Sequence, residues 1–455
     1  MPALARLGSK GSGGIAGPFR NRRHIERASE MITSNQVKSR VCALALLTLT
    51  CCAICSAQAP SEPKGMGEMT GRDDSGADRK TFTLGIYPED QRPLLGSGSV
   101  SDWARKHRIR SFGWLDGGFT SVSNASGLVA EAPTPNRFSD QFMLDAAWLV
   151  VEKSTTKTFS WGFRVDFYAG SDAALLRSLN HFGPDSKRWG TEFRQAYFKL
   201  HTPILFREGI DWTAGKINIP TGVETTLSPY NQLYSRGYFW THDGSSGTAL
   251  FATAHTNPQV DVVLGTTMGY NTSFILRGRA PSYLARVLYH PATERKQQFI
   301  ATVYSGPKPL AAQANHVGTW QTLVELQARE VWTPRFNQAF DVGYFSDPGD
   351  PANGRHNSGS RTAFVLTSYE LNRIVALHTR LEWFDDPHGS RAAIPGTYGE
   401  ATVGITVHPK PWFEFRPEIR GDFSGQHSFG EVDSTLRHRN QLSAGVELLL
   451  KGRLF

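Results

Sequence analysis

The sequence lacks a long hydrophobic run. No segment reaches the ~18 consecutive apolar residues that can cross a bilayer as a helix, and apolar residues make up only 39% of the chain. The longest apolar stretch, 41–53, is too short for such a span and has the length of a signal-peptide core. A membrane protein built from helices is therefore excluded.

Cysteine is nearly absent too, and all four cysteines lie upstream of Ala57. Lys38 and Arg40 precede the apolar stretch and small residues follow it, which is the order of regions in a secretory signal. We expect cleavage after Ala57, because a cut after Ala59 would leave Pro60 beside the scissile bond. The exported chain then has no cysteine, which excludes a disulfide framework and a thiolate metal site.

The chain is predicted to have three parts. Residues 1–57 are an N-terminal extension plus the signal peptide, and translation can start at Met1 or at Met31, which gives a signal of ordinary length. Residues 58–107 are polar and rich in Gly, Pro, Asp and Lys, and predict a flexible periplasmic leader. Residues 108–455 are predicted to form the folded part.

A strong positive charge is likewise missing from the exported chain. Residues 1–57 contain eight of the 49 basic and two of the 41 acidic residues. The remainder has 41 basic and 39 acidic residues, so its net charge is +2 instead of the +8 of the whole chain. Such a balance gives no reason to expect a nucleic-acid partner.

The folded part contains segments of roughly ten residues in which apolar and polar residues alternate. A period of two is typical of a strand that presents one set of side chains to each face. The segments 375–383 and 413–423 place Arg and Glu opposite their apolar face, and 413–423 is expected to bulge or end at Pro417. The clearest segment is 159–170, whose apolar set is Phe159, Trp161, Phe163, Val165 and Phe167.

The connections between these segments alternate in length. Seven short links and eight long links give sixteen strands, with fourteen to eighteen as the range. The short links are 152–158, 202–208, 256–259, 291–297, 333–335, 372–373 and 409–411. The long links are 124–137, 170–190, 218–247, 269–283, 306–317, 347–359, 385–397 and 424–439. In the long link 170–190, a stripe of leucines also predicts a small helix over 172–183.

This pattern predicts an all-β fold, namely a transmembrane antiparallel β-barrel of about sixteen strands with short periplasmic turns and long external loops. A sheet can cross lipid only as a closed barrel, because every backbone polar group must be paired there. The apolar face would then contact outer-membrane lipid, and the charged face would line the lumen. A soluble secreted β-sandwich that binds a ligand is the rival interpretation, since one strand alone fits both.

The last strand supports the barrel. Alternate residues of 442–450 are apolar, and the chain ends on Phe455. A terminal strand with a final aromatic residue resembles the signal that the outer-membrane assembly machinery recognises, although Phe455 is out of phase with the apolar face. We therefore predict Phe455 as the assembly signal and that machinery as a partner.

Several motifs resemble one family. The segments "FGWLDGGFTSVSN", "NRF" (136–138), "FYAGSDA" (167–173), "QAYFKL" (195–200) and "GKINIPTGVE" followed by "YSRGY" are similar to those of bacterial outer-membrane beta-barrel porins of the porin-2, OmpL-like type. The resemblance covers most of 109–455. It implies a non-enzymatic channel in the bacterial cell outer membrane that passes small hydrophilic solutes or ions by passive diffusion.

By the same resemblance, the third long link would fold into the lumen and narrow it. The alternative is that it only covers the mouth while the wall charges pair with one another. The candidates for the narrowing are Glu224, Tyr230, Tyr234, Arg236 and Asp243. The candidates for the charged wall are Arg164, Asp166, Arg380, Glu382, Glu414, Arg416, Glu418 and Arg420.

An enzymatic role has little support in the sequence. The fourteen histidines form no HExxH motif, and no GxSxG motif occurs, so we expect no catalytic residue, no cofactor and no metal. The rival is an outer-membrane barrel enzyme of the lipase or protease type, which would use His242, Asp243, Ser245 and Ser246 or the segment 385–388. A homotrimer is possible for such a porin, but no residue identifies an interface.

Overall fold

The structure is a computed structural model that describes residues 87–455 with gaps. All described residues belong to one compact unit, and none of its helices is long and apolar enough to cross a membrane. The gaps are 97, 132–133, 184–185, 187, 243–245, 277–279, 293–295, 308–319, 347–348, 351–354, 357–358, 390 and 393. The predicted signal peptide lies outside the described residues.

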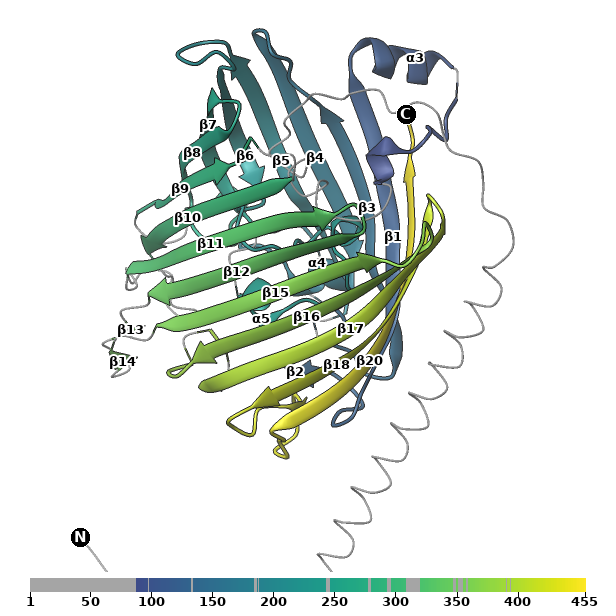
Figure 1. The fold of residues 1–455 in the computed structure, drawn as a ribbon, viewed down its shortest axis with the longest axis vertical. Coiled ribbons are helices and arrows are strands. Elements are labelled where there is room, and N and C mark those ends of the chain that lie inside the picture. The colour runs from purple at the N-terminus through teal and green to yellow at the C-terminus, as the bar shows by residue number, and fades with distance from the viewer. Residues whose placement is uncertain are drawn as a thin grey trace, which may run out of the picture. The chain divides into compact units, whose positions relative to one another are not determined.

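Sixteen antiparallel strands of the described chain form a closed barrel (Figure 1). The first eight are β1 (Ile109–Val122), β3 (Gln141–Lys153), β4 (Ser160–Gly170), β5 (Gly190–Thr202), β6 (Ile210–Ile217), β7 (Gly247–Asn257), β8 (Val260–Thr267) and β9 (Ser282–Tyr289). The others are β10 (Gln297–Pro307), β11 (Trp320–Thr333), β12 (Phe336–Ser346), β15 (Ser360–Glu370), β16 (Val375–Asp386), β17 (Gly396–Lys410), β18 (Phe413–Ser424) and β20 (Asn440–Arg453). The predicted fold class and strand number are confirmed.

Consecutive barrel strands are neighbours, and the last strand closes on the first. Phe119 in β1 is paired with Val446 in β20, and Phe112 with Arg453. Two small sheets lie outside the barrel ladder. They pair β2 (Val129–Ala130) with β19 (Gly430–Glu431) and β13 (Gly349–Asp350) with β14 (Arg355–His356).

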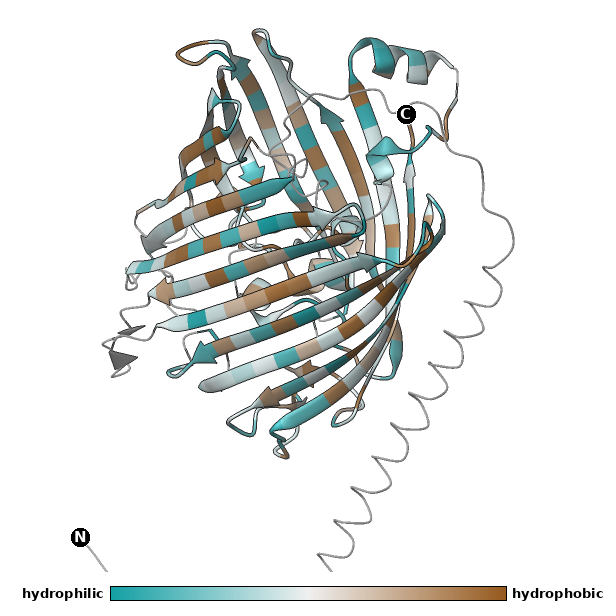
Figure 2. Cartoon of the chain, in the orientation of Figure 1, coloured by the Kyte–Doolittle hydropathy of each residue, from teal (hydrophilic) through white to brown (hydrophobic). Residues whose placement is uncertain are grey.

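The alternation of the sequence becomes an alternation between the two faces of the wall. In β4, the Trp161 and Phe167 side chains are 49% and 37% exposed, whereas Arg164 and Asp166 are 4% and 0% exposed. Figure 2 shows the same banding along most strands. An apolar outer face and a polar inner face is the pattern of a barrel in lipid.

Exposed aromatic residues gather near both ends of the strands. Trp and Tyr prefer the level of the lipid headgroups, so two such girdles mark the two surfaces of a bilayer. At the end with the short turns they are Trp161, Trp212, Tyr289, Trp332, Tyr369 and Trp412. At the end with the long loops they are Phe142, Trp189, Tyr283, Trp320, Trp383 and Phe423.

Short and long connections alternate around the whole barrel, as the sequence predicts. The short turns are 154–159, 203–209, 258–259, 290–296, 334–335, 371–374 and 411–412. Pro417 stays within β18 opposite Val446, but its other ladder is interrupted. The pairing of β18 with β17 omits Ile405 and Thr406, and the register shifts beyond Val407. A missing N–H at Pro417 explains the interruption.

Short helices occur before and within the barrel connections. Two lie in the last part of the predicted leader, η1 (Pro88–Asp90) and α3 (Ser99–Lys106). The others are α4 (Ser171–Leu175), η2 (Ser228–Tyr230) and α5 (Tyr238–His242). The helix predicted over 172–183 is thus much shorter, because the Leu179 backbone instead pairs with Asn271 and Ser273 of another loop.

Candidate functional site

The third long loop, which the structure describes over 218–242 and at Ser246, lies inside the barrel and contacts walls far apart around it. Tyr234 Oη donates to Asp145 Oδ2 of β3 at 2.6 Å, and Tyr238 Oη donates to Asp422 Oδ1 of β18 at 2.8 Å. The Ser228 hydroxyl donates to Asp116 of β1. Side chains that point inward from several strands can meet one loop only in the lumen.

Wall carboxylates bind the backbone of this loop. Glu382 accepts from the N–H groups of Tyr238 at 2.5 Å and Phe239 at 2.7 Å. Glu418 accepts from the N–H groups of Tyr234 at 2.9 Å and Ser235 at 3.0 Å. Because the residues involved are buried, these charge-assisted bonds are among the stronger hydrogen bonds of the molecule.

Wall arginines bind the carbonyl groups of the same loop. Arg380 donates to the Ser235 oxygen at 2.6 Å and Arg420 to the Arg236 oxygen at 2.6 Å. Arg416 donates to the Ser228 oxygen at 2.9 Å. The walls of β16 and β18 therefore hold both the donors and the acceptors of the loop backbone, so the loop conformation is set by the barrel.

The two charged residues of the loop that the structure describes are also engaged. Glu224 pairs with Arg380 at 2.7 Å and accepts from the Gly237 N–H at 2.7 Å. Arg236 donates to the carbonyl oxygens of Leu233 and Tyr234, each at 2.6 Å. Glu224 thus joins loop to wall, whereas Arg236 folds the loop onto itself. Asp243 lies outside the described residues.

Burial raises the pKa of Tyr230, Tyr234 and Tyr238 well above the usual value of a tyrosine. Neighbouring carboxylates add to this effect, because a phenolate beside a carboxylate would be repelled. The three hydroxyls therefore remain protonated donors to wall or leader carboxylates throughout the physiological pH range. Gly118 faces Tyr234, and a Cβ there would collide with its hydroxyl.

Six of the eight predicted wall charges take part in three ion-pair groups, whereas Glu382 and Glu418 bind the loop backbone, and all eight are buried. Arg164 pairs with Asp166 at 2.6 Å and with Glu152 at 3.2 Å. Arg416 pairs with Glu414, which also binds Lys451.

The third group joins β16, β17 and β18. Arg380 pairs with Glu400 at 2.7 Å, and Arg420 pairs with Asp422 at 2.8 Å. Wall charges therefore pair with one another and, in β16 and β18, also hold the loop, a combination of the two interpretations that the sequence left open.

Sequence reasoning missed several residues that complete this arrangement. Asp116, Asp145 and Glu400 face the lumen beside residues that were predicted. Glu325 of β11 accepts from the Gly222 N–H at 2.6 Å. Their common signal is a charge on the inner parity of a strand. In β1, β3 and β17, Gly and Ala residues weaken the visible alternation, so this signal is difficult to recognise there.

The lumen is also partly apolar. The Phe239 ring lies 5.6 Å from Phe345, and the Tyr270 ring lies 4.3 Å from Tyr304. Leu284 and Leu323 belong to the same buried cluster on the inner face of β9 and β11. The lumen expected to be charged therefore also has an apolar patch, on which the loop packs through Phe239.

The segment before β1 reaches the loop at the end with the short turns. Tyr87 stacks on Tyr230 at 5.0 Å, and Tyr230 Oη donates to Glu89 Oε1 at 2.8 Å. The Leu94 N–H donates to the Arg453 oxygen at 2.8 Å, which fixes the segment to the end of β20. Residues 87–95 thus enter the barrel mouth and contact the tip of the loop.

Residues of the enzymatic alternative do not assemble into a known constellation in the described chain. Ser246 contacts Ser178 at 3.3 Å and Asn271 at 3.5 Å, and neither is a base. Ser368 and His378 form a buried pair at 2.8 Å, but the second ring nitrogen of His378 contacts Thr406 at 3.1 Å. The described residues contain no cluster of ligands that could hold a metal ion.

A closed barrel with two aromatic girdles, an apolar outer face and a loop fixed in its lumen defines the class: a β-barrel of the bacterial outer membrane. The family described as "Putative beta-barrel porin-2, OmpL-like" matches residues 108–451. The chain belongs to this family of outer-membrane porins, which confirms the resemblance and removes the soluble sandwich. The short turns are accordingly periplasmic.

Solved structures share the fold at low sequence identity. The outer membrane channel DcaP of Acinetobacter baumannii has a TM-score of 0.51 and 11% identity over 75% of this chain and 96% of DcaP. An anion-selective porin from Comamonas acidovorans has a TM-score of 0.53 and 10% identity over 75% of this chain and 99% of that porin. OprB of Pseudomonas putida has a TM-score of 0.50 and 11% identity over 81% of this chain and 100% of OprB. No curated protein matches the chain.

Proposed function

We propose that the chain passes small hydrophilic solutes and ions across the outer membrane by passive diffusion, without enzymatic chemistry. The observation that carries this proposal is the third long loop, whose described part 218–242 is held within the lumen by wall charges. Such a loop narrows the lumen, so a solute must pass between the loop and the wall side chains that face it. The narrowing would be formed by Glu224, Tyr230, Tyr234, Arg236 and Asp243, with the three wall groups setting the local field.

Refolded protein in a planar bilayer tests this function. We expect discrete single-channel steps whose size scales with salt concentration, together with swelling of liposomes in small sugars. A protein that inserts and resists protease but gives no steps at any voltage would contradict the proposal. Lipase and protease assays on the same preparation, with Ser246→Ala as control, test the non-enzymatic role.

A paired substitution tests whether the loop is the narrowing. Glu382→Gln with Glu418→Gln keeps the side-chain shapes but removes the charge from four bonds to the loop backbone. We expect a noisier open channel with a larger mean conductance. Lys410→Gln on the exposed periplasmic rim is the matched control, and an identical trace from both variants would exclude a role for these anchors.

We also propose a homotrimer whose interface is the wall of β6 to β9, in which β7 has 11 residues and the other three strands are the shortest of the barrel. These three strands have 8 residues each, whereas β1, β11 and β20 have 14. A tilted strand needs about 9–11 residues to cross the hydrocarbon, so a partner would relieve the mismatch on this side. The proposal predicts that Leu264→Arg yields monomers on mild native gels, while Leu381→Arg on β16 does not.

The domain boundaries remain a prediction of the sequence. We propose that the exported chain begins at Gln58 and that the leader 58–107 lies in the periplasm. Intact mass of the protein purified from outer membranes tests the cleavage site. A mass that includes residues 31–57 would show that the signal is not removed.

A further inference from the structure

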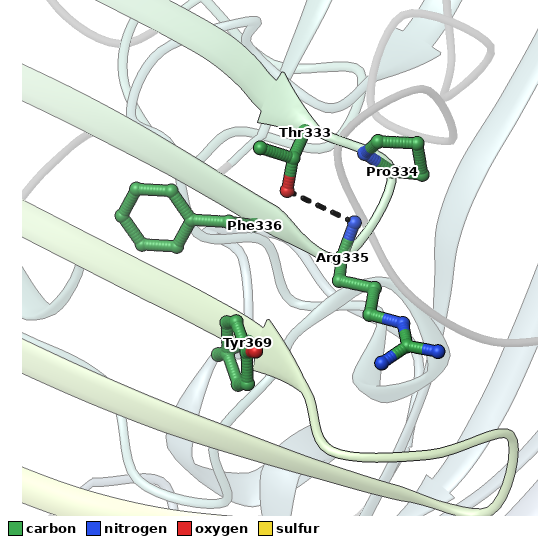
Figure 3. A pocket seen from close by; sticks show the side chains of 5 residues that line it. All are labelled: Thr333, Pro334, Arg335, Phe336 and Tyr369. Atoms are coloured by element: carbon green, nitrogen blue, oxygen red, sulfur yellow. Dashed lines mark hydrogen bonds between the residues drawn. The ribbon is translucent and has the colours of Figure 1, made fainter.

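An open groove lies on the outer face of the barrel at the periplasmic end of β11, β12 and β15. It is lined by the turn residues Thr333, Pro334 and Arg335 and by the rings of Phe336 and Tyr369 (Figure 3). The two rings are cross-strand partners and lie on the same face. They stand at the level of the periplasmic aromatic girdle, where lipid headgroups meet the protein.

Arg335 is the cation of this groove. Its side chain is exposed, and among the described residues its guanidinium makes no hydrogen bond and no ion pair. In Figure 3 the guanidinium extends from the turn beyond the end of β15, apart from the rings of Phe336 and Tyr369. The nearest acidic influence is Glu370, whose N–H donates to the Arg335 carbonyl at 2.8 Å and whose charge interacts with Arg335. The arginine is therefore placed to bind an anion from the membrane side.

A shallow apolar depression lies further along the same wall. Its floor is formed by Ala301 and Ala328, and its rim by Phe299, Leu326 and Phe340. Small residues between large ones leave room for an acyl chain. Phe336 lines the first groove and Phe340 lines the second. The two residues are four positions apart on β12, so the grooves are separated by ~13 Å along the strand at 3.3 Å per residue.

This distance matches a lipid of one leaflet. Half of the ~30 Å hydrocarbon core is ~15 Å, and a strand tilted by ~45° turns ~13 Å along β12 into ~9 Å of depth. Both grooves therefore lie within one leaflet, and the acyl chains of a lipid whose phosphate is at Arg335 can reach Ala301 and Ala328. Between the two grooves, Trp332 Nε1 donates to Gln338 Oε1 at 3.1 Å, and Gln338 donates to Thr367 at 3.1 Å. These polar groups lie at the depth of the ester linkages.

We propose that this face holds one glycerophospholipid of the periplasmic leaflet with an anionic headgroup, whose phosphate binds Arg335. Arginine matches a phosphate oxygen pair through parallel N–H groups, and Tyr369 and Phe336 flank the glycerol. We favour a lipid over a second copy of the chain, because the exposed cation Arg335 stands near an apolar depression, which matches an anionic headgroup with acyl chains.

Native mass spectrometry of the full-length protein in detergent, titrated with dioleoylphosphatidylglycerol, tests this site. We expect the first adduct to saturate well before the others and to form more readily than with dioleoylphosphatidylcholine or dioleoylglycerol. Arg335→Gln should weaken that first adduct about tenfold, as expected for loss of one charge-assisted pair. Arg207→Gln, at another exposed periplasmic turn, is the matched control.

Two further variants keep the proposal falsifiable. Glu370→Gln should strengthen the adduct, because it removes the competing carboxylate, and Ala328→Phe should weaken it by filling the depression. Heat-dependent gel mobility confirms that each variant is a folded barrel. Equal adduct formation by wild type, Arg335→Gln and Arg207→Gln would overturn the proposal, and binding of dioleoylglycerol as tight as phosphatidylglycerol would overturn the role of the phosphate. Neither result depends on channel conductance.

Discussion

At the scale of the residue, what matters most is the face on which a side chain lies. Phe163 and Arg164 are neighbours in β4, yet one faces outward and the other is 4% exposed in the lumen. The outer side chain contacts lipid, which cannot hydrate a charge, and the inner side chain pairs with two carboxylates. Adding a charge at position 163 and removing the charge at position 164 should therefore both destabilise the barrel, the first by exposing a charge to lipid and the second by leaving a buried carboxylate unpaired.

Phe163→Arg places a charge on the lipid face. Such a change costs about 2–4 kcal/mol at the bilayer midplane and about 0–1 kcal/mol near the interface. Because Phe163 lies two residues from Trp161 of the periplasmic girdle, we expect a modest decrease in the yield of folded barrel in vesicles and in the urea midpoint. Phe163→Leu is the control, since it keeps an apolar surface. Equal folding of the arginine and leucine variants would show that position 163 does not face lipid.

Arg164→Ala leaves Asp166 as a buried carboxylate without its cation, while Glu152 keeps its pair with Arg110 at 2.6 Å. Removing one partner of a buried pair costs about 3–5 kcal/mol, so urea unfolding from vesicles should show a clear loss of stability. Arg105→Ala breaks the exposed pair of Arg105 with Asp102 at 3.2 Å and should change stability little. A stable Arg164→Ala variant would mean that water reaches this group freely.

At the scale of the element, the strands could be predicted and the loop contacts could not. The alternation in β4, β16 and β18 determines which residues face inward, because the period of two fixes the face. Which atom of the loop meets Glu382 or Glu418 depends on barrel closure and register. Closure and register depend on residues far apart in the sequence, so the pattern within one strand cannot predict them. The same reason explains why contacts of residues 87–95 went unpredicted.

The segment 87–95 is expected to restrict the channel from the periplasmic side. Tyr87→Ala removes the ring that stacks on Tyr230 and weakens the hold on Glu89. We expect a larger single-channel conductance, because the segment can then leave the mouth. Trp103→Ala, on the exposed face of α3, serves as control. Unchanged conductance in the Tyr87 variant would place the segment outside the conducting path.

At the scale of the whole molecule, the sheet has no free edge. Ten residue pairs join β1 to β20, and the Phe455 carbonyl accepts from the Ser111 N–H at 3.1 Å. The end of the chain is thereby fixed beside the first strand, with Phe455 partly exposed. This position leaves the Phe455 ring accessible before closure and useful for recognition.

Phe455→Ser tests the predicted assembly signal. We expect slower insertion by purified assembly machinery in proteoliposomes, because the aromatic ring that is recognised is lost. The urea midpoint of barrel that has already folded should stay near that of wild type, since the backbone bond to Ser111 remains. Leu454→Ser is the control, and equal insertion rates for the two variants would exclude Phe455 as the signal.

The pairing of the first strand with the last also sets the order of events during synthesis and export. β1 leaves the ribosome and crosses the inner membrane long before β20 exists, yet β1 cannot satisfy its backbone groups without it. The early strands must therefore wait in the periplasm with an apolar face and an open edge. The edge of β1 therefore stays open until the residues up to Arg453 can pair with it.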